Sequence, residues 1–168
     1  CRAADELPRP LDPRLKIELL AEHPQIVTPT GLDVDEHGRV WAVESNTHFP
    51  PADYSGHPTD RILVMQDRNG DGKADDVAVF TDGLTHTMSV AVPPRWVDGR
   101  WLRVNGHKGP DVQSQRSSSE PSTIPPQPST LFVATRNEIL LLQDSDGDLK
   151  ADARARLVHL ETAGNYPH

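Results

Sequence analysis

The sequence has almost no cysteine, few apolar residues for its length and no long hydrophobic run. Cys1 is the only cysteine among 168 residues, which excludes a disulfide, a CxxC zinc site and a CxxCH haem attachment within the chain. Hydrophobic residues make up 35% of the composition, which predicts a folded core smaller than the length suggests. No apolar stretch approaches the roughly 20 residues that a membrane-spanning helix needs.

Basic residues are also few compared with acidic ones, and the formal net charge is −8. An acidic surface repels phosphate backbones, so we expect no nucleic acid as a partner. Much of the acid is concentrated in Asp67–Asp76 and Asp144–Asp152, which indicates a bound cation. The first residue, Cys1, could carry the lipid of a mature lipoprotein and anchor the protein to a membrane, or it could mark a trimmed signal peptide or an arbitrary cut. We expect a secreted protein, periplasmic or on the cell surface.

What is abundant is period-two alternation of apolar and polar residues, which predicts an all-β protein with antiparallel sheets. Residues 1–27 read as an extended lead-in, with one candidate strand at Lys16–Ala21. The segment Thr28–Ser45 reads as a β-hairpin around the turn "DEHG", and Arg61–Asp67 and Asp75–Gly83 as two further strands. The later strands are expected in the segments Thr87–Val92, Thr130–Asn137, Glu138–Asp144 and Ala153–Glu161.

An internal repeat favours a β-propeller over a sandwich. "RILVMQDRNGDGKADD" and "EILLLQDSDGDLKADA" align without a gap at an offset of 77 residues. Removing the Pro/Ser-rich insertion at residues 93–129 leaves about 40, the length of one propeller blade. Residues 28–168 are therefore predicted to form the first two blades of a propeller. We expect them to be inactive alone, because the remaining blades are needed to close the ring.

The repeated acidic turns predict two calcium sites. Asp67, Asn69 and Asp71, and likewise Asp144, Asp146 and Asp148, follow the alternate spacing with which an EF-hand loop surrounds Ca²⁺. The seventh-position carbonyls belong to Lys73 and Lys150, and a bidentate carboxylate would have to come from Asp75, Asp76 or Asp152. Alternatively, these are hairpin turns that are rich in Asp, Asn and Gly for conformational reasons.

Three histidines are the candidates for chemistry. If strands alternate in direction, His48, His86 and His168 lie at one end of the sheets, and the acidic turns and the insertion lie at the other. Histidines at the mouth of a propeller channel could act as a general base or as ligands, with Glu44 and Asn46 as the next candidates. The alternative is a set of ordinary loop histidines.

Four segments carry a resemblance to a known family: "LDPRLKIELLAEHPQIVTPTGLDVDEHGRVWAVESNTHFPP", "GHPTDRILVMQDRNGDGKADD", "ATRNEILLLQDSDGDLKAD" and the closing "NYPH". They resemble the N-terminal propeller of the membrane-bound dehydrogenase family of planctomycetes and their relatives. That propeller is similar to the six-bladed quinoprotein glucose/sorbosone dehydrogenases. The resemblance implies a sugar or alcohol substrate, pyrroloquinoline quinone as a cofactor, and a c-type haem only in a longer parent protein.

Two functions follow as expectations. In the first, the parent protein is a periplasmic dehydrogenase that passes electrons to a quinone or a downstream haem, and His48 or His86 takes the substrate hydroxyl proton. In the second, the propeller binds an extracellular ligand or partner without catalysis, and calcium only makes it rigid.

Overall fold

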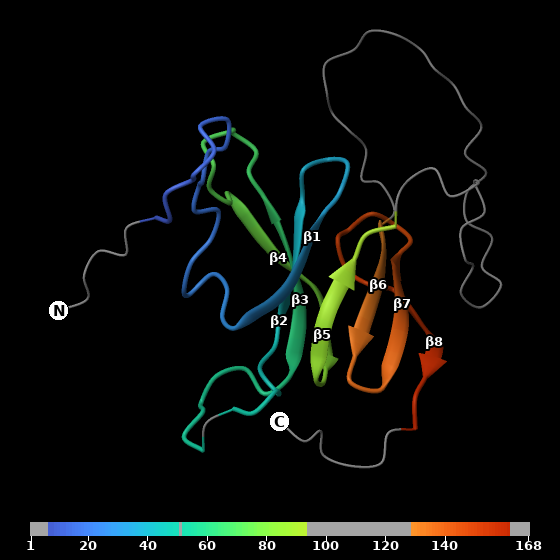
Figure 1. Ribbon diagram of the computed structural model, residues 1–168. Coiled ribbons are helices and arrows are strands. Elements are labelled where there is room, and N and C mark those ends of the chain that lie inside the picture. The colour runs from blue at the N-terminus through green and yellow to red at the C-terminus, as the bar shows by residue number, and fades with distance from the viewer. Residues whose placement is uncertain (1–6, 51, 94–128, 162–168) are drawn as a thin grey trace, which may run out of the picture.

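The computed structural model describes residues 7–50, 52–93 and 129–161, and within them the protein is all-β (Figure 1). Eight strands form two four-stranded antiparallel sheets, and in each sheet neighbours in the chain are neighbours in space. The first sheet contains β1 (Pro29–Val34), β2 (Val40–Glu44), β3 (Asp60–Gln66) and β4 (Asp76–Leu84). The second contains β5 (Thr87–Ala91), β6 (Ser129–Thr135), β7 (Glu138–Asp144) and β8 (Ala153–His159). These described parts contain no helix that could cross a membrane.

The predicted all-β class and antiparallel strands are confirmed, and the strand ends lie within two residues of the predicted ones. Two details differ. Lys16–Ala21 forms no strand, because no described strand runs beside it as a hydrogen-bonded partner. Ser129, predicted to end the insertion, instead begins β6, where it pairs with Asp144.

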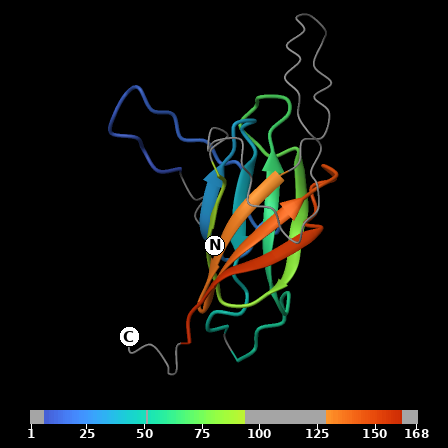
Figure 2. The same ribbon diagram turned by 90° about the vertical axis from the view of Figure 1, so that its right-hand side faces the viewer.

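The core lies between the two sheets. Trp41, Ile62 and Phe80 of the first sheet pack with Leu131 and Leu140 of the second, and all five side chains are almost completely buried. In Figure 1, β5 stands next to β1 and β2, and these strands are in contact. Figure 2 shows the same two layers from the side. The core therefore joins the sheets into one folded unit.

The closest approach of the sheets depends on Gly31 in β1. A Cβ atom at this position would lie 3.0 Å from Ser89 Cα and 3.1 Å from the Met88 carbonyl oxygen. Glycine alone lets β1 and β5 approach this closely, since its neighbours across the gap are backbone atoms. The Val92 amide then donates to the Asp33 carboxylate at 2.8 Å, which ties the far end of β5 to β1.

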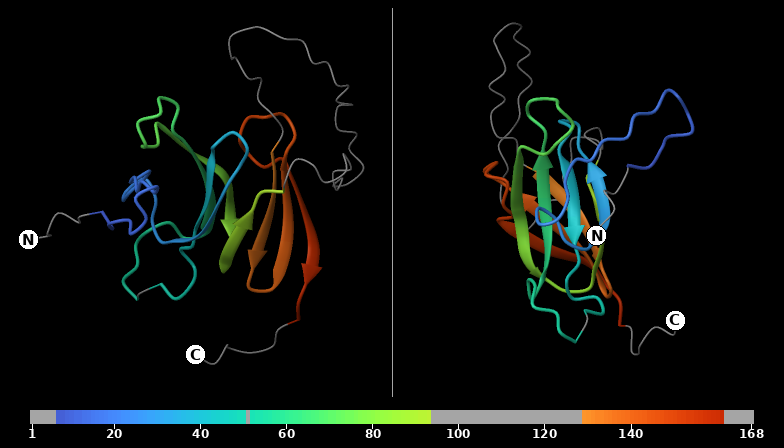
Figure 3. Two further views of the ribbon diagram at one scale, coloured as in Figure 1. Left: turned by 45° about the horizontal axis from the view of Figure 1, so that its top comes forward. Right: turned by 90° about the vertical axis from the view of Figure 1, so that its left-hand side faces the viewer.

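Both sheets also carry apolar residues on the faces that point away from each other. Side chains alternate along a strand, so Ala42, Leu63 and Met65 lie opposite the core face of the first sheet. Phe132 and Leu141 pair in register on the outer face of the second sheet. The N-terminal segment lies on the outer side of the first sheet (Figures 1 and 3), where the Ala74 amide donates to the Leu20 carbonyl at 2.8 Å.

Alternating strand direction sorts the connections between two ends. The β1–β2 turn and both acidic turns lie at one end. The loop at residues 45–59 and the short β4–β5 connection lie at the other (Figure 1). The predicted position of the insertion falls on residues 94–128, outside the described residues.

Candidate functional site

A cleft of about 390 Å³ lies at the end of the first sheet opposite the acidic turns. It lies on the outer face, because Glu44 alternates with the core residue Val43. Most of the residues that line it have polar side chains, but the surface that they expose in the cleft is mainly apolar. The lining consists of His23, Val27, Glu44, Asn46, Asp53, Tyr54, Ser55, Gly56, His57 and Arg61.

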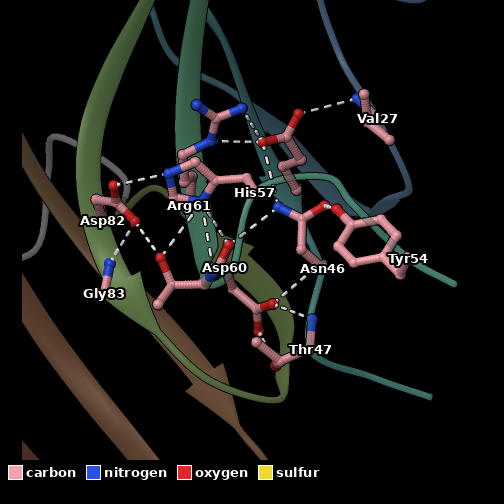
Figure 4. Close-up of polar contacts among 11 residues, drawn as sticks. Val27, Asn46, Thr47, Tyr54, His57, Asp60, Arg61, Asp82 and Gly83 are labelled. Atoms are coloured by element: carbon pink, nitrogen blue, oxygen red, sulfur yellow. Dashed lines mark hydrogen bonds and ion pairs between the residues drawn. The ribbon is translucent and has the colours of Figure 1, made fainter. Parts of the chain in front are cut away.

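The floor of the cleft is an ion pair between Glu44 and Arg61 from adjacent strands. The Arg61 Nε donates to Glu44 Oε2 at 2.6 Å, and a second guanidinium nitrogen contacts the same oxygen. The Val27 amide donates to the other carboxylate oxygen at 3.0 Å (Figure 4). Glu44 is only 1% exposed. Since both of its oxygens accept hydrogen bonds from within the protein, this geometry holds Glu44 in place and offers no free oxygen as a base.

Asn46 forms the wall between the cleft and the sheet. Its amide oxygen accepts a hydrogen bond from the Tyr54 hydroxyl at 2.8 Å, and its amide nitrogen donates to the Thr59 carbonyl at 3.0 Å. The side chain therefore fixes the Tyr54 ring at the cleft (Figure 4).

His57 lies at the cleft between the loop and β4. Its Nε2 is 3.3 Å from a carboxylate oxygen of Asp82, and its Nδ1 is 3.0 Å from the Thr59 carbonyl. The Thr59 hydroxyl donates to the other Asp82 oxygen at 2.5 Å. Burial raises the pKa of Asp82, but hydrogen bonds from Thr59 and Gly83 and the nearby His57 lower it by more. Asp82 therefore stays ionised and orients the imidazole.

A second carboxylate, Asp60, is completely buried at the start of β3. One oxygen accepts from the Asn46 and Thr47 amides at 2.7 and 2.8 Å, and the other from the Thr47 hydroxyl at 3.1 Å and the Thr87 amide at 2.7 Å. Burial raises the pKa of Asp60, but these hydrogen bonds outweigh it and hold the pKa below its usual value. Asp60 thus joins the loop to the first residue of the second sheet.

The structure brings two of the three predicted histidines together. The rings of His48 and His86 are perpendicular, with centroids 6.4 Å apart. His48 is exposed, and His86 is half-buried. His168 lies outside the described residues. No described contact joins Glu44 to either ring.

The first acidic turn satisfies most of its polar groups internally. Asp67 accepts hydrogen bonds from the Gly70 and Gly72 amides at 2.7 and 2.8 Å. The Gly72 bond is the main reason that the pKa of Asp67 is lowered. The other predicted ligands pair nearby: Asn69 with Asp71 and Asp75, the Lys73 amide with Asp71, and Asp76 with Arg68. No three described carboxylates of this turn place their oxygens within 4.8 Å of one another. The predicted site also uses the Asn69 amide oxygen and a backbone carbonyl, so it stays a prediction.

The second turn repeats this hydrogen-bond pattern but draws its carboxylates together. Asp144 accepts from the Gly147 and Leu149 amides at 2.6 and 3.1 Å, and oxygens of Asp144, Asp146 and Asp152 lie within 4.8 Å of one another. The other predicted ligand, Asp148, instead accepts from the Lys150 amide at 2.8 Å. Burial is the main cause that raises the pKa of Asp144, and the two neighbouring carboxylates at positions 146 and 148 add to it.

Leu149 occupies the place that Gly72 takes in the first turn, and its φ is 65°. Left-handed backbone is costly for a branched side chain, which explains why the sequence predicts a poorer turn here. Leu149 packs against the edge of the core instead, and this contact offsets the strain.

Several residues in or next to the cleft had no role assigned from the sequence. Asp60 and Arg61 lie in β3, His57 in the loop before it and Asp82 in β4, and the antiparallel pairing of β3 with β4 brings these elements together. The one local signal was the polar run "GHPTD", which ends at the first residue of β3 and marks a loop with more hydrogen-bonding groups than a simple connection requires.

The described lining of this cleft does not fit a bound pyrroloquinoline quinone. This cofactor carries several carboxylates, and an anionic ligand of that kind needs unpaired cations around it. Arg61 is the only arginine or lysine in the cleft lining, and its charge is already paired with Glu44.

Comparison with known proteins gives one match. A family model described as a domain of unknown function, DUF7133, matches residues 10–98, which is more than half of the chain. No curated protein and no solved structure matches.

Proposed function

The chain belongs to the DUF7133 family, and we propose that its two sheets are neighbouring blades of a β-propeller that binds a sugar or an alcohol in the cleft of the first sheet. The cleft is the observation that carries this proposal. It combines an aromatic ring with fixed donors and acceptors, which suits a ligand with several hydroxyl groups.

The propeller architecture rests on the outer faces of the sheets. A sheet that is apolar on one face needs one neighbour, whereas a sheet that is apolar on both faces needs two. On the outer face of the first sheet, Leu32 is 67% and Val79 is 39% exposed. On that of the second, Ile139 and Val158 are paired in register and each 39% exposed. A ring of blades would cover all of these side chains.

A repeated hydrogen bond supports the same architecture. The Ala74 amide donates to the Leu20 carbonyl, and the Ala151 amide, one repeat later, donates to the Phe80 carbonyl, both at 2.8 Å. Phe80 lies in β4, the outermost strand of the preceding sheet. The segment around Leu20 therefore takes the place, relative to the first sheet, of the outermost strand of a preceding blade.

Binding can be tested by titrating the full chain with a panel of monosaccharides and polyols while amide and side-chain NMR shifts are recorded. We expect shifts at Tyr54, His57 and Asn46. Tyr54→Phe should weaken binding, because the Asn46 amide oxygen no longer accepts the hydrogen bond that fixes the position of the ring. Arg156→Ala, an exposed change on β8, is the control. Shifts scattered over both sheets, or no binding by the unaltered chain, would refute the proposal.

A second candidate function is oxidation of a sugar or an alcohol beside His48 and His86, which do not line the cleft, as part of a secreted sugar or alcohol dehydrogenase. The pairing of His48 with His86 favours it, because two adjacent imidazoles can accept and pass on a hydroxyl proton. A bound quinone would accept the hydride, and residues outside this cleft would hold it. Dye reduction by the longer parent protein, lost on His48→Gln or His86→Gln, is the expected result. If both variants reduce the dye as well as the parent, the histidines have no part in the reaction.

We further propose that the second acidic turn binds Ca²⁺. Asp144, Asp146 and Asp152 would supply oxygen ligands, the donor type that Ca²⁺ prefers. Burial is the main cause of the raised pKa of Asp144 and the neighbouring carboxylates add to it, and a bound cation would favour the ionised form against both. Calcium would stabilise the turn rather than take part in catalysis. Secretion completes the proposal, and fractionation of cells that express the native protein tests it.

A further inference from the structure

We infer that Asp60 and Thr47 form a positioning pair that holds His48 and His86 together at the junction of the two sheets. The inference rests on the proposed role of the two histidines, but the contacts that support it are independent of any ligand. Both histidines lie in connections, at the end of the sheets where the first sheet passes into the second.

Asp60 fixes the backbone that leads to His48. Its carboxylate accepts from the amides of Asn46 and Thr47, the two residues before His48. Asp60 is 0% exposed, so no water competes for these bonds. A buried carboxylate with every lone pair directed at fixed donors can adopt few other positions.

Thr47 connects the backbone that Asp60 fixes to His86. Its hydroxyl donates to Asp60 at 3.1 Å and accepts the His86 amide at 2.7 Å. The same Asp60 oxygen accepts a hydrogen bond from the Thr87 amide at 2.7 Å. The backbone amides of two successive residues at the start of the second sheet, His86 and Thr87, are therefore both hydrogen-bonded to the pair. The hydroxyl of Thr47 therefore links the two histidine-bearing connections directly, beside the link that Asp60 makes to Thr87.

The backbone around the pair is held in an uncommon conformation. His86 has φ 50° and Phe49, next to His48, has φ 51°. Non-glycine residues adopt this region at an energetic cost, and such positions occur often at functional sites where surrounding contacts maintain them. The Arg136 amide donates to the His86 carbonyl at 2.9 Å, so His86 is held on both sides.

Thr47→Val in the full chain tests the inference, because it keeps the side-chain shape and removes the hydroxyl. We expect the nuclear Overhauser contacts between the His48 and His86 rings to disappear, and the His86 amide to exchange with solvent about tenfold faster, as loss of one hydrogen bond implies. Thr47→Ser should restore both. Thr30→Val is the matched control, since the Thr30 hydroxyl also faces β5 but makes only a 3.5 Å contact with Thr87.

Unchanged ring contacts and exchange in Thr47→Val would overturn the inference. If Thr47→Val does not fold, Thr47→Ala and Thr47→Ser are compared instead, and only the serine variant should keep the contacts between the two histidine rings. Neither readout needs a ligand. A failure to bind any sugar or alcohol would therefore count against the proposed function alone, and a failure of the ring contacts to respond would count against the positioning pair alone.

Discussion

Replacing Gly31 with alanine should weaken the contact between the two sheets. The added Cβ would lie 3.0 Å from Ser89 Cα and 3.1 Å from the Met88 carbonyl oxygen, closer than ordinary van der Waals contact. These neighbours are backbone atoms of β5, so they cannot move aside by changing a rotamer. The strands would have to separate by a few tenths of an ångström, and the core between them would loosen.

The expected loss of unfolding free energy is about 1 to 2 kcal/mol. Overpacking of a close contact costs about 1–3 kcal/mol. Against this, alanine lowers the entropy of the unfolded chain and stabilises by about 0.4–1 kcal/mol where the backbone allows it. Gly31 is not among the glycines with positive φ, so the backbone itself does not oppose alanine. A net loss of stability therefore means that the tight sheet contact outweighs the entropic gain.

Urea unfolding of the full chain, followed by circular dichroism at fixed calcium concentration, measures this loss. Thr30→Ala is the control, because Thr30 is an exposed neighbour in the same strand, and we expect its effect to stay within about 0.5 kcal/mol. If Gly31→Ala is as stable as the unaltered protein or more so, β1 and β5 do not approach each other closely, and the two-sheet packing is wrong.

Three further predictions concern charge. Asp146→Asn should reduce the heat of calcium binding in calorimetry and the calcium-induced rise in Tm, and equal heats in both proteins would contradict the site. Burial raises the pKa of Asp35, whose ordinary value is 3.8, but hydrogen bonds from Trp41 and Arg39 lower it by more. Its stabilisation is present above pH 3.8 and is lost as the pH falls through its lower folded value, so Asp35→Asn should flatten the acid limb of the stability curve. Arg61→Met leaves the buried Glu44 without its cation and should cost about 3 kcal/mol, whereas a change below about 1 kcal/mol in urea unfolding would show that the pair is dispensable.

The sequence was sufficient for the strands because short apolar runs are bounded by turn residues. Val43, Ile62 and Val64 belong to such runs, which are buried on both faces of the sheet. The repeat at an offset of 77 residues predicted the second sheet from the first. The strand expected at Lys16–Ala21 failed because alternation alone does not supply a partner strand.

The site was less accessible to prediction, because it depends on contacts between distant elements. His57 and Asp82 meet only through the pairing of β3 with β4, and the pattern of each segment gives no sign of the other. Glu44 was expected as a reactive group. The structure shows that its charge is matched by Arg61, a residue whose role nothing in the local sequence indicated. His48 and His86 were expected at one end of the sheets, and the structure shows their rings close together.

The repeated tether of the acidic turns has a consequence for the order of folding. Each donor follows its acceptor in the chain: Leu20 precedes Ala74, and Phe80 precedes Ala151. During synthesis, the acceptor that each turn needs has therefore already left the ribosome. Each sheet can dock onto the structure made before it without waiting for later sequence, so the apolar face exposed at any moment is limited to that of the newest sheet.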